Sequence, residues 1–222
     1  MRESIEGTVS QRWSDALRNR RFRLECAITL PLLVASLIGL SSFLEFVEER
    51  PGVVLNDPIL AVISPSNFTW LTFALIYGGL IFGIATLSRH PNQLLLAFQS
   101  YVVMVTLRIA AMYVVPLDPP AGLIPLGDPL VQFVGSGTIL TKDLFFSGHT
   151  ATLLLLGFVS RGRVSRTLFY LAAVIVGTCV ILQHVHYTID VLAAPCFAYL
   201  AYRVVFLAHR GSEREESTER NT

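Results

Sequence analysis

The chain has 222 residues, of which 53% are hydrophobic and only 15% are charged, whereas about a quarter of the residues in a soluble domain are charged. The charged residues are concentrated in gaps between long apolar runs, which is the pattern of a membrane protein. No basic stripe is interleaved with aromatic residues, which argues against a nucleic-acid-binding surface. Cys26, Cys179 and Cys196 all fall inside apolar runs, and we interpret them as small buried hydrophobic residues without a disulfide or redox role.

Residues 1–24 form a polar, arginine-rich amino-terminal segment. Val9, Trp13 and Leu17 recur in it at helical spacing, which predicts a short interfacial helix on the cytoplasmic surface of the membrane. We do not expect a signal peptide, because the charged region is too long and no small-residue cleavage site follows the next apolar run.

Six apolar runs follow, and each is predicted to be a transmembrane helix. A helix needs about 20 residues to cross the bilayer, within a range of about 17–25, and the fourth and fifth runs are short. The predicted fold class is therefore all-α, a polytopic membrane protein whose membrane domain, residues 25–208, is a bundle of six transmembrane helices. Residues 209–222 form a charged cytoplasmic tail, which we expect to be disordered. The six runs lie near 25–47, 69–88, 94–116, 144–161, 167–184 and 188–208.

Arginine marks one side of the membrane. With six spans, the two termini and the second and fourth loops lie on one side and hold most of the basic residues, whereas the loops of the other side hold only Arg50 and Lys142. Because cytoplasmic loops carry the excess of lysine and arginine, both termini are predicted to be cytoplasmic, with loops one, three and five facing outward or into a lumen. The basic residues on the first side are Arg2, Arg12, Arg18, Arg20, Arg21, Arg23, Arg89, Arg161, Arg163, Arg166, Arg210, Arg214 and Arg220.

The third loop, about 117–143, is rich in proline and glycine. Proline removes a backbone donor and breaks helices, so most of this loop is predicted not to be helical. We expect it to cap the outer mouth of the bundle.

Two short polar runs lie at the outer ends of apolar segments. Ser147-Gly148-His149-Thr150 opens the fourth span and His186-Tyr187-Thr188-Ile189-Asp190 opens the sixth, so both are expected on the outer side at one depth. Placing an ionisable side chain inside a membrane costs roughly 2.5 kcal/mol of free energy or more, unless the side chain is paired or hydrated. Three such groups at matched depth therefore favour a functional site over unrelated interfacial residues.

These groups suit nucleophilic phosphate chemistry. His186 and Asp190 are four residues apart, so on a helix they would share one face within contact range, where the carboxylate fixes the tautomer of the imidazole and stabilises its charged form. The other nitrogen of His186 can then attack phosphorus, and His149 can protonate the departing oxygen. The run around His149 surrounds an expected helix start, where N–H groups and the helix dipole favour an anion. Its other members are Ser147, Gly148 and Thr150.

Extended versions of these runs resemble a known family. Asp143-x-x-x-Ser147-Gly148-His149-Thr150 and His186-Tyr187-Thr188-Ile189-Asp190-Val191 look like the two signature motifs of the sphingomyelin synthase family, a branch of the type 2 phosphatidic acid phosphatase superfamily. The resemblance extends to Arg108-x-x-x-Met112-Tyr113 in the third span and more weakly to Leu55-Asn56-Asp57 in the first outer loop. It covers nearly all of residues 25–208.

The resemblance implies a six-span phosphotransferase that moves phosphocholine or phosphoethanolamine from a glycerophospholipid to ceramide and releases diacylglycerol. His186 would be the nucleophile, Asp190 would orient it, and His149 would act first as acid and then as base. No metal and no other cofactor is expected. The expected partners are membrane lipids: phosphatidylcholine or phosphatidylethanolamine as donor, and ceramide or diacylglycerol as acceptor. Candidate residues for binding the substrate and its phosphate are Ser147, Gly148, Thr150, Arg108, Tyr113, Asp143 and Tyr187.

Three nearby residues have alternative interpretations. A guanidinium suits phosphate, so Arg108 is expected to contact the donor phosphate, although it could instead be a buried partner for a carboxylate or carbonyl. Asp143 either caps the fourth helix or contacts a cationic headgroup. His184 is expected to point away from His186, and a metal pair of these two histidines lacks an obvious third ligand.

The chain also departs from the family pattern. Thr141 and Lys142 replace the usual cysteine and glycine, and Leu95 and Leu96 stand near the place of a basic pair, which leaves the choice of headgroup and acceptor open. The lysine–arginine–proline signature of the superfamily's phosphatases is missing, and so is the arginine ahead of their last histidine, which favours the synthase-like branch. Two alternatives stand beside the transferase. One is a lipid phosphate phosphatase or phospholipase C-type hydrolase, in which water attacks the same phosphohistidine, and the other is a non-catalytic lipid transporter or scaffold.

Overall fold

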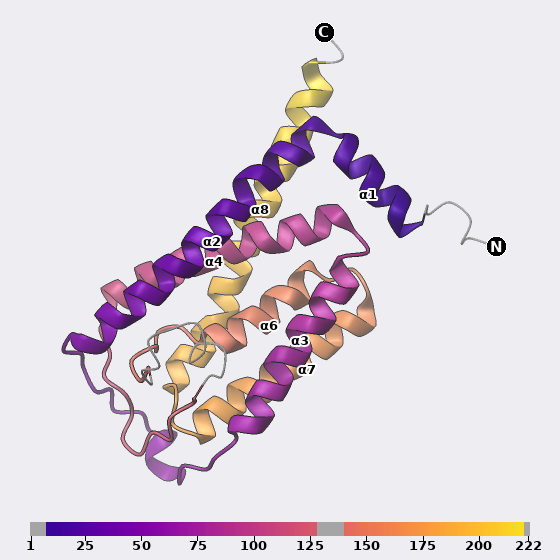
Figure 1. The fold of residues 1–222 in the computed structure, drawn as a ribbon. Helices are drawn as coiled ribbons and strands as arrows, with labels where there is room; N and C mark the ends of the chain where they lie inside the picture. The colour runs from indigo at the N-terminus through magenta and orange to yellow at the C-terminus, as the bar shows by residue number, and fades with distance from the viewer. Residues whose placement is uncertain (1–7, 128–139, 220–222) are drawn as a thin grey trace.

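The computed structural model describes residues 8–127 and 140–219. Expectations that concern Arg2, Arg220 and the middle of the third loop, 128–139, lie outside the described residues. Within them the regular structure is helical (Figure 1), so the all-α prediction is confirmed. The α-helices are α1 (Val9–Arg18), α2 (Arg20–Glu49), α3 (Thr69–Leu87), α4 (Pro91–Val114), α6 (Gly148–Val159), α7 (Arg163–Leu182) and α8 (Thr188–Glu219), and a short 3-10 helix, η1 (Leu60–Val62), lies in the first loop.

Five of the described helices, α2, α3, α4, α7 and α8, are long and apolar enough to cross a membrane. They match five of the predicted spans, and the prediction of a polytopic helical membrane protein is confirmed. The fourth span is shorter than predicted, because α6 has only 12 residues. At 1.5 Å per residue it is about 18 Å long, well below the roughly 30 Å of a hydrocarbon core. Residues 144–147 stay outside the helix, and the N–H of Ser147 donates to the carbonyl of Asp190 (3.1 Å).

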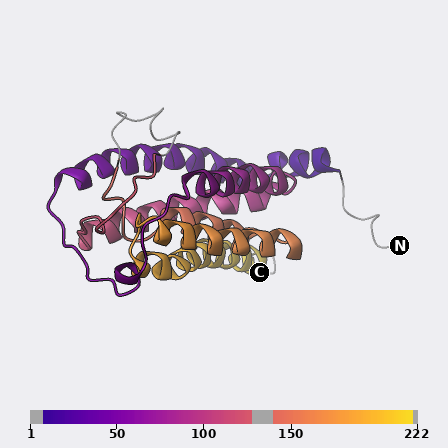
Figure 2. The same cartoon turned by 90° about the horizontal axis from the view of Figure 1, so that it is seen from below.

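The short helix α6 lies at the centre of the bundle, in contact with α3, α4, α7 and α8. Figure 2 shows the long α2 along one edge of the bundle, with α7 and α8 along the other. Small residues allow a close approach of α8, since Ala194 and Ala198 are fully buried in one cluster with Ala151 of α6. Leu153 of α6 packs into a second cluster with Phe169 of α7. Side chains at the first turn of α6 are therefore enclosed by protein.

The predicted amino-terminal helix is present as α1. Its first turn is closed by a capping box, in which the hydroxyl of Thr8 accepts from the N–H of Gln11 and the Gln11 side chain accepts from the N–H of Thr8. The indole of Trp13 donates to the carbonyl of Ser88 (2.7 Å), which holds α1 against the turn between α3 and α4.

Two expectations about single segments are wrong. The tail is not disordered from residue 209, because α8 continues to Glu219; its charged residues include good helix formers such as Glu213, Arg214 and Glu215. Of the cysteines, all free, Cys179 is buried but Cys196 is exposed. An apolar run does not distinguish a face that packs on protein from a face that is covered by lipid.

The loops predicted to share the outer side gather at one end of the bundle. The N–H of Ser66 in the first loop donates to the carbonyl of Leu182 (2.8 Å), and the N–H of Ile124 in the third loop donates to the carbonyl of Gln183 (3.1 Å). These bonds join loops one, three and five. The contact of α1 with Ser88 lies at the other end, so the loops alternate between two ends as six spans require.

Candidate active site

The two polar runs meet at the end of the bundle where α6 and α8 begin. The backbone bond from Ser147 to Asp190 joins them directly. Ser147, His186 and Asp190 are each at most 1% exposed. Groups from two distant stretches of sequence therefore share one buried volume at one end of the bundle.

His186 and Asp190 form a buried pair, with Nδ1 of the histidine 3.4 Å from Oδ2 of the aspartate. The sequence predicted that the two residues share one face of a helix, and this is wrong. Helix α8 begins only at Thr188, and His186 lies in the turn before it. Asp190 stands in the first turn of α8 and reaches back, so that Oδ2 also accepts the N–H of Tyr187 (3.0 Å), like the acidic member of a capping box. One carboxylate thus fixes both the helix start and the imidazole.

His149 lies in the first turn of α6, opposite His186. The two ring centroids are 6.4 Å apart and the ring planes are 66° apart. A near-attack geometry needs about 3–3.5 Å between reacting atoms, and a general acid needs about 2.6–3.2 Å to the oxygen that it protonates. The spacing suits one phosphoryl group held between the two rings. Because His149 is half-buried and His186 is fully buried, the open side of the site is on the His149 side.

Arg108 of α4 brings a positive charge to the start of α6. Its guanidinium lies directly against Gly148, where an added β-carbon would be 1.6 Å from Nη1, so this approach requires glycine. The first N–H groups of a helix have no intrahelical partner and favour an anion. Arg108 and the first turn of α6 therefore form a cradle that suits phosphate. The hydroxyls of Ser147 and Thr150, 3.2 Å apart, are buried at this turn.

Asp143 pairs with Arg108, with 2.5 Å between Oδ1 and Nη2. It is not the cap of the fourth helix, as one interpretation predicted, since Ser147 takes that position. The Arg108 side chain is 8% exposed, and its Nε has no hydrogen-bond partner among the described residues. Asp143 thus orients the guanidinium that lies against the first turn of α6.

Tyr101 is a residue beside the site that the sequence analysis missed. Its ring packs against the buried cluster that contains Phe146 and Ala151 at the start of α6, and it lies near Arg108 and Asp143. It precedes Arg108 by seven residues on α4, or two turns on the same face. That spacing is the signal that could have found it.

Tyr187 and Asp57 hold the first outer loop against the start of α8. The buried Tyr187 hydroxyl donates to the carbonyl of Asp118 (2.8 Å) and accepts from the N–H of Leu55 (3.2 Å). Asp57 accepts from the N–H (2.7 Å) and the hydroxyl (3.1 Å) of Thr188. Burial acts to raise the pKa of Asp57, but these hydrogen bonds outweigh it and hold the pKa below its ordinary value. Both side chains are occupied by protein, so they position the turn before α8.

Two other residues near the motifs lie away from the paired histidines. Tyr113 is 65% exposed at the end of α4, so the structure does not bring it to the site. His184 points elsewhere, as expected, with Nδ1 2.8 Å from the carbonyl of Ala121 and Nε2 3.1 Å from that of Ile63. In the part of the chain that the structure describes, no group of three His, Cys, Asp or Glu side chains could hold a metal ion.

Residues 142–209 match the family described as PAP2 superfamily C-terminal. The matched segment contains α6, α7 and the membrane part of α8, and with them His149, His186 and Asp190. The match supports the type 2 phosphatidic acid phosphatase superfamily, whose members are phosphatases and phosphotransferases, and it does not extend to the sphingomyelin synthase-like branch. No curated protein and no solved structure matches the chain.

Proposed function

We propose that this protein is a sphingomyelin synthase-like phosphotransferase of the membrane, which moves phosphocholine or phosphoethanolamine from a glycerophospholipid to ceramide or a similar lipid alcohol. The observation that carries the proposal is the pair of imidazoles 6.4 Å apart, one of them held by a buried carboxylate. The superfamily match supports phosphate chemistry. The choice of the transferase branch rests on the two signature motifs.

The first half-reaction begins with the donor phosphate beside Arg108 and the first turn of α6. Because Nδ1 of His186 faces Asp190, Nε2 is the nitrogen that attacks phosphorus. The P–N bond forms as the P–O bond to the glycerol oxygen breaks, and His149 gives that oxygen a proton. The products are diacylglycerol and a phosphohistidine that carries the headgroup.

The second half-reaction runs through the same atoms in reverse roles. His149, now neutral, removes the proton from the hydroxyl of the acceptor lipid. The oxygen attacks phosphorus, the P–O bond forms and the P–N bond to His186 breaks. If water takes the place of the lipid alcohol, the same residues make the protein a lipid phosphate phosphatase or a phospholipase C-type hydrolase.

The proposed topology places both termini in the cytoplasm and the site on the extracytoplasmic or lumenal side. Its support is the distribution of arginine between the two sets of loops. The three outer loops that gather around the site hold few basic residues, and Lys142 among them is bound to Asp118 (2.9 Å). Labelling of Ser66→Cys, at an exposed position of the first loop, from the cytoplasmic side would contradict this topology.

The test uses purified protein with phosphatidylcholine or phosphatidylethanolamine labelled in the phosphate. We expect label in a new sphingolipid when ceramide is present, and an acid-labile phosphoenzyme when no acceptor is added. His186→Ala should abolish turnover and labelling of the protein. His90→Ala, at the other end of the bundle, is the matched histidine control and should keep both.

The outcomes separate the alternatives. Release of a water-soluble phospho-headgroup that does not respond to ceramide would show a hydrolase in place of a transferase. Unchanged lipid conversion by His186→Ala would exclude both mechanisms that pass through His186. An absence of lipid conversion by the wild type would favour the non-catalytic transporter or scaffold.

A further inference from the structure

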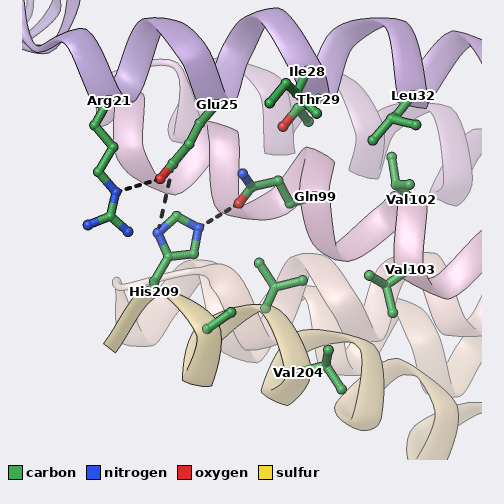
Figure 3. Close-up of a pocket in the computed structure, with 12 residues that line it drawn as sticks. Arg21, Glu25, Ile28, Thr29, Leu32, Gln99, Val102, Val103, Val204 and His209 are labelled. Atoms are coloured by element: carbon green, nitrogen blue, oxygen red, sulfur yellow. Dashed lines mark hydrogen bonds and ion pairs between the residues drawn. The ribbon is translucent and has the colours of Figure 1, made fainter. Parts of the chain in front are cut away.

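A groove opens on the side of the bundle, at the far end from the paired histidines. It lies where α2, α4 and α8 run past one another (Figure 3), and its volume is about 360 Å³, within the range of ligand pockets. Ile28, Leu32 and Val204, which line it, are each at least half exposed. Because all three helices are long and apolar enough to span a membrane, these exposed apolar side chains face lipid. The groove is therefore open to the acyl chains of the bilayer.

One end of this groove is polar. Arg21 Nε is 2.8 Å from Glu25 Oε1, and the ring of His209 reaches Glu25 (3.9 Å from Nδ1) and Gln99 (2.6 Å from Nε2), as the dashed lines in Figure 3 show. The groove thus has a polar end and an apolar length, as a phospholipid does. Its aliphatic lining consists of Ile28, Leu32, Val102, Val103, Val204, Val205 and Ala208.

The length of the groove corresponds to one leaflet. Arg21 stands in the first turn of α2, and Leu32 lies eleven residues further along, a distance of about 16 Å on a helix. Half of a hydrocarbon core is about 15 Å. With the polar end at the level of the headgroups, the aliphatic end reaches the middle of the bilayer. An occupant of this shape and depth is a lipid of the leaflet on this side.

The charge around the polar end selects the type of lipid. Glu25, the acidic residue of the groove, is already engaged by Arg21 and His209. Basic clusters next to a transmembrane helix attract anionic headgroups. The arginines at this end of α1, α2 and α8 are Arg18, Arg20, Arg21, Arg23 and Arg210.

We propose that this groove binds one anionic phospholipid, with an acyl chain along Leu32 and Val204 and its phosphate beside Arg21 and His209. The lipid is not a substrate, because His209 is nineteen residues along α8 from Asp190, or about 28 Å. A lipid bound there contacts α2, α4 and α8 together and stabilises their packing. The proposal is independent of the reaction that the paired histidines perform.

Native mass spectrometry of the full chain, purified in detergent with phosphatidylglycerol or phosphatidylcholine added, tests the proposal. We expect the protein to retain one phosphatidylglycerol, with a several-fold preference over phosphatidylcholine. Val204→Trp fills the apolar part of the groove and should lower retention at least fivefold. Val174→Trp is the matched control, since Val174 is exposed on α7 outside the groove, and should retain the lipid as the wild type does.

A second variant tests the polar end. Arg21→Gln removes one charge and should weaken phosphatidylglycerol retention about fivefold while leaving phosphatidylcholine retention unchanged. Thermal midpoints check folding, and phosphatidylglycerol should raise the midpoint of the wild type and of Val174→Trp but not that of Val204→Trp. Equal retention of the two lipids by the wild type would overturn the proposal. So would equal retention by the two tryptophan variants, or a change of oligomeric state in Val204→Trp alone, which would make the groove an interface between copies.

Discussion

One histidine–carboxylate pair lies at the start of α8 and another lies farther along the helix, at His209. The two pairs have the same kinds of side chain but differ in spacing and burial. His186 and Asp190 are 3.4 Å apart, with side chains 1% and 0% exposed. His209 and Glu25 are 3.9 Å apart, with side chains 30% and 24% exposed. The first pair is enclosed by protein, whereas the second lies at the mouth of an open groove. Residue types alone therefore do not identify which pair can perform catalysis.

The difference lies in what holds each carboxylate. Asp190 is fixed by the N–H of Tyr187 as well as by the imidazole, on a short side chain in the first turn of a helix. Glu25 is held by Arg21, four residues before it on α2, through two long side chains that lose conformational entropy when they pair. A buried charge without its partners is costly, while an exposed pair contributes little to stability. The carboxylate of Asp190 is therefore held in one position, whereas that of Glu25 can change its position when a ligand binds.

Asp190→Asn should have the largest effect, because it removes the charge that orients His186 while keeping a side chain that can accept from the N–H of Tyr187. We expect lipid turnover to fall about 10³-fold or more, with a change in the pH profile of kcat that a loss of packing alone would not cause. Glu45→Asn, at an exposed position on α2, is the control. A loss of turnover below tenfold would show that the buried pair has no special status over the exposed one.

Asp57→Asn should have an intermediate effect, on stability and its pH dependence. The folded pKa of Asp57 is lowered, so its contribution is present above the unfolded value of about 3.9 and is lost as the pH falls through the folded pKa. The variant should lose about 1 kcal/mol at neutral pH, as for a lost helix cap, and its stability should fall less steeply below about pH 4. Thermal midpoints in detergent between pH 7 and pH 3 measure this effect. Asp15→Asn, at an exposed position on α1, is the control. If the thermal midpoint of Asp57→Asn fell as steeply below pH 4 as that of the wild type, Asp57 would not be the source of this pH dependence.

His209→Ala should have the smallest effect. The His209–Glu25 pair is partly exposed, and an ion pair of this kind contributes about 1 kcal/mol at most, so the thermal midpoint in lipid-free detergent should fall only slightly. High salt should reduce even that difference, because it screens exposed charges. A loss of several kcal/mol in the free energy of unfolding, measured in the same detergent, would show that the partly exposed pair stabilises the fold as much as the buried pair does.

Hydrophobic pattern predicted the helices well and the connections less well. The predicted span at 69–88 agrees closely with α3, Thr69–Leu87, because apolar length is a local property. The helix start expected within Ser147–Thr150 is present, since α6 begins at Gly148, but the backbone bond that joins Ser147 to Asp190 belongs to no local pattern. For the same reason the structure joins His186 to Asp190 through a turn and a cap, where the sequence indicated one helical face.

The composition of the site was predictable to the extent that its chemistry is unusual in a membrane. Histidines and a carboxylate at matched depth stand out against apolar surroundings, and so does Arg108. Tyr101 did not stand out, because an aromatic residue in an apolar span is ordinary. Tyr113 was selected because it stands in the family-like motif Arg108-x-x-x-Met112-Tyr113, but residues five apart on a helix do not share a face, and its side chain is exposed.

The brevity of α6 has a consequence for the bilayer itself. A helix of about 18 Å leaves about 12 Å of a 30 Å hydrocarbon core unspanned, so in the proposed topology the first turn of α6 would lie below the level of the neighbouring headgroups. A lipid whose phosphate reaches that turn must sink relative to its leaflet, or the leaflet must become thinner around the protein. Hydrophobic mismatch of this kind costs a fraction of a kcal/mol per ångström. If the proposed reaction takes place there, its rate depends on bilayer thickness, and membranes with shorter acyl chains should favour delivery of the phosphate.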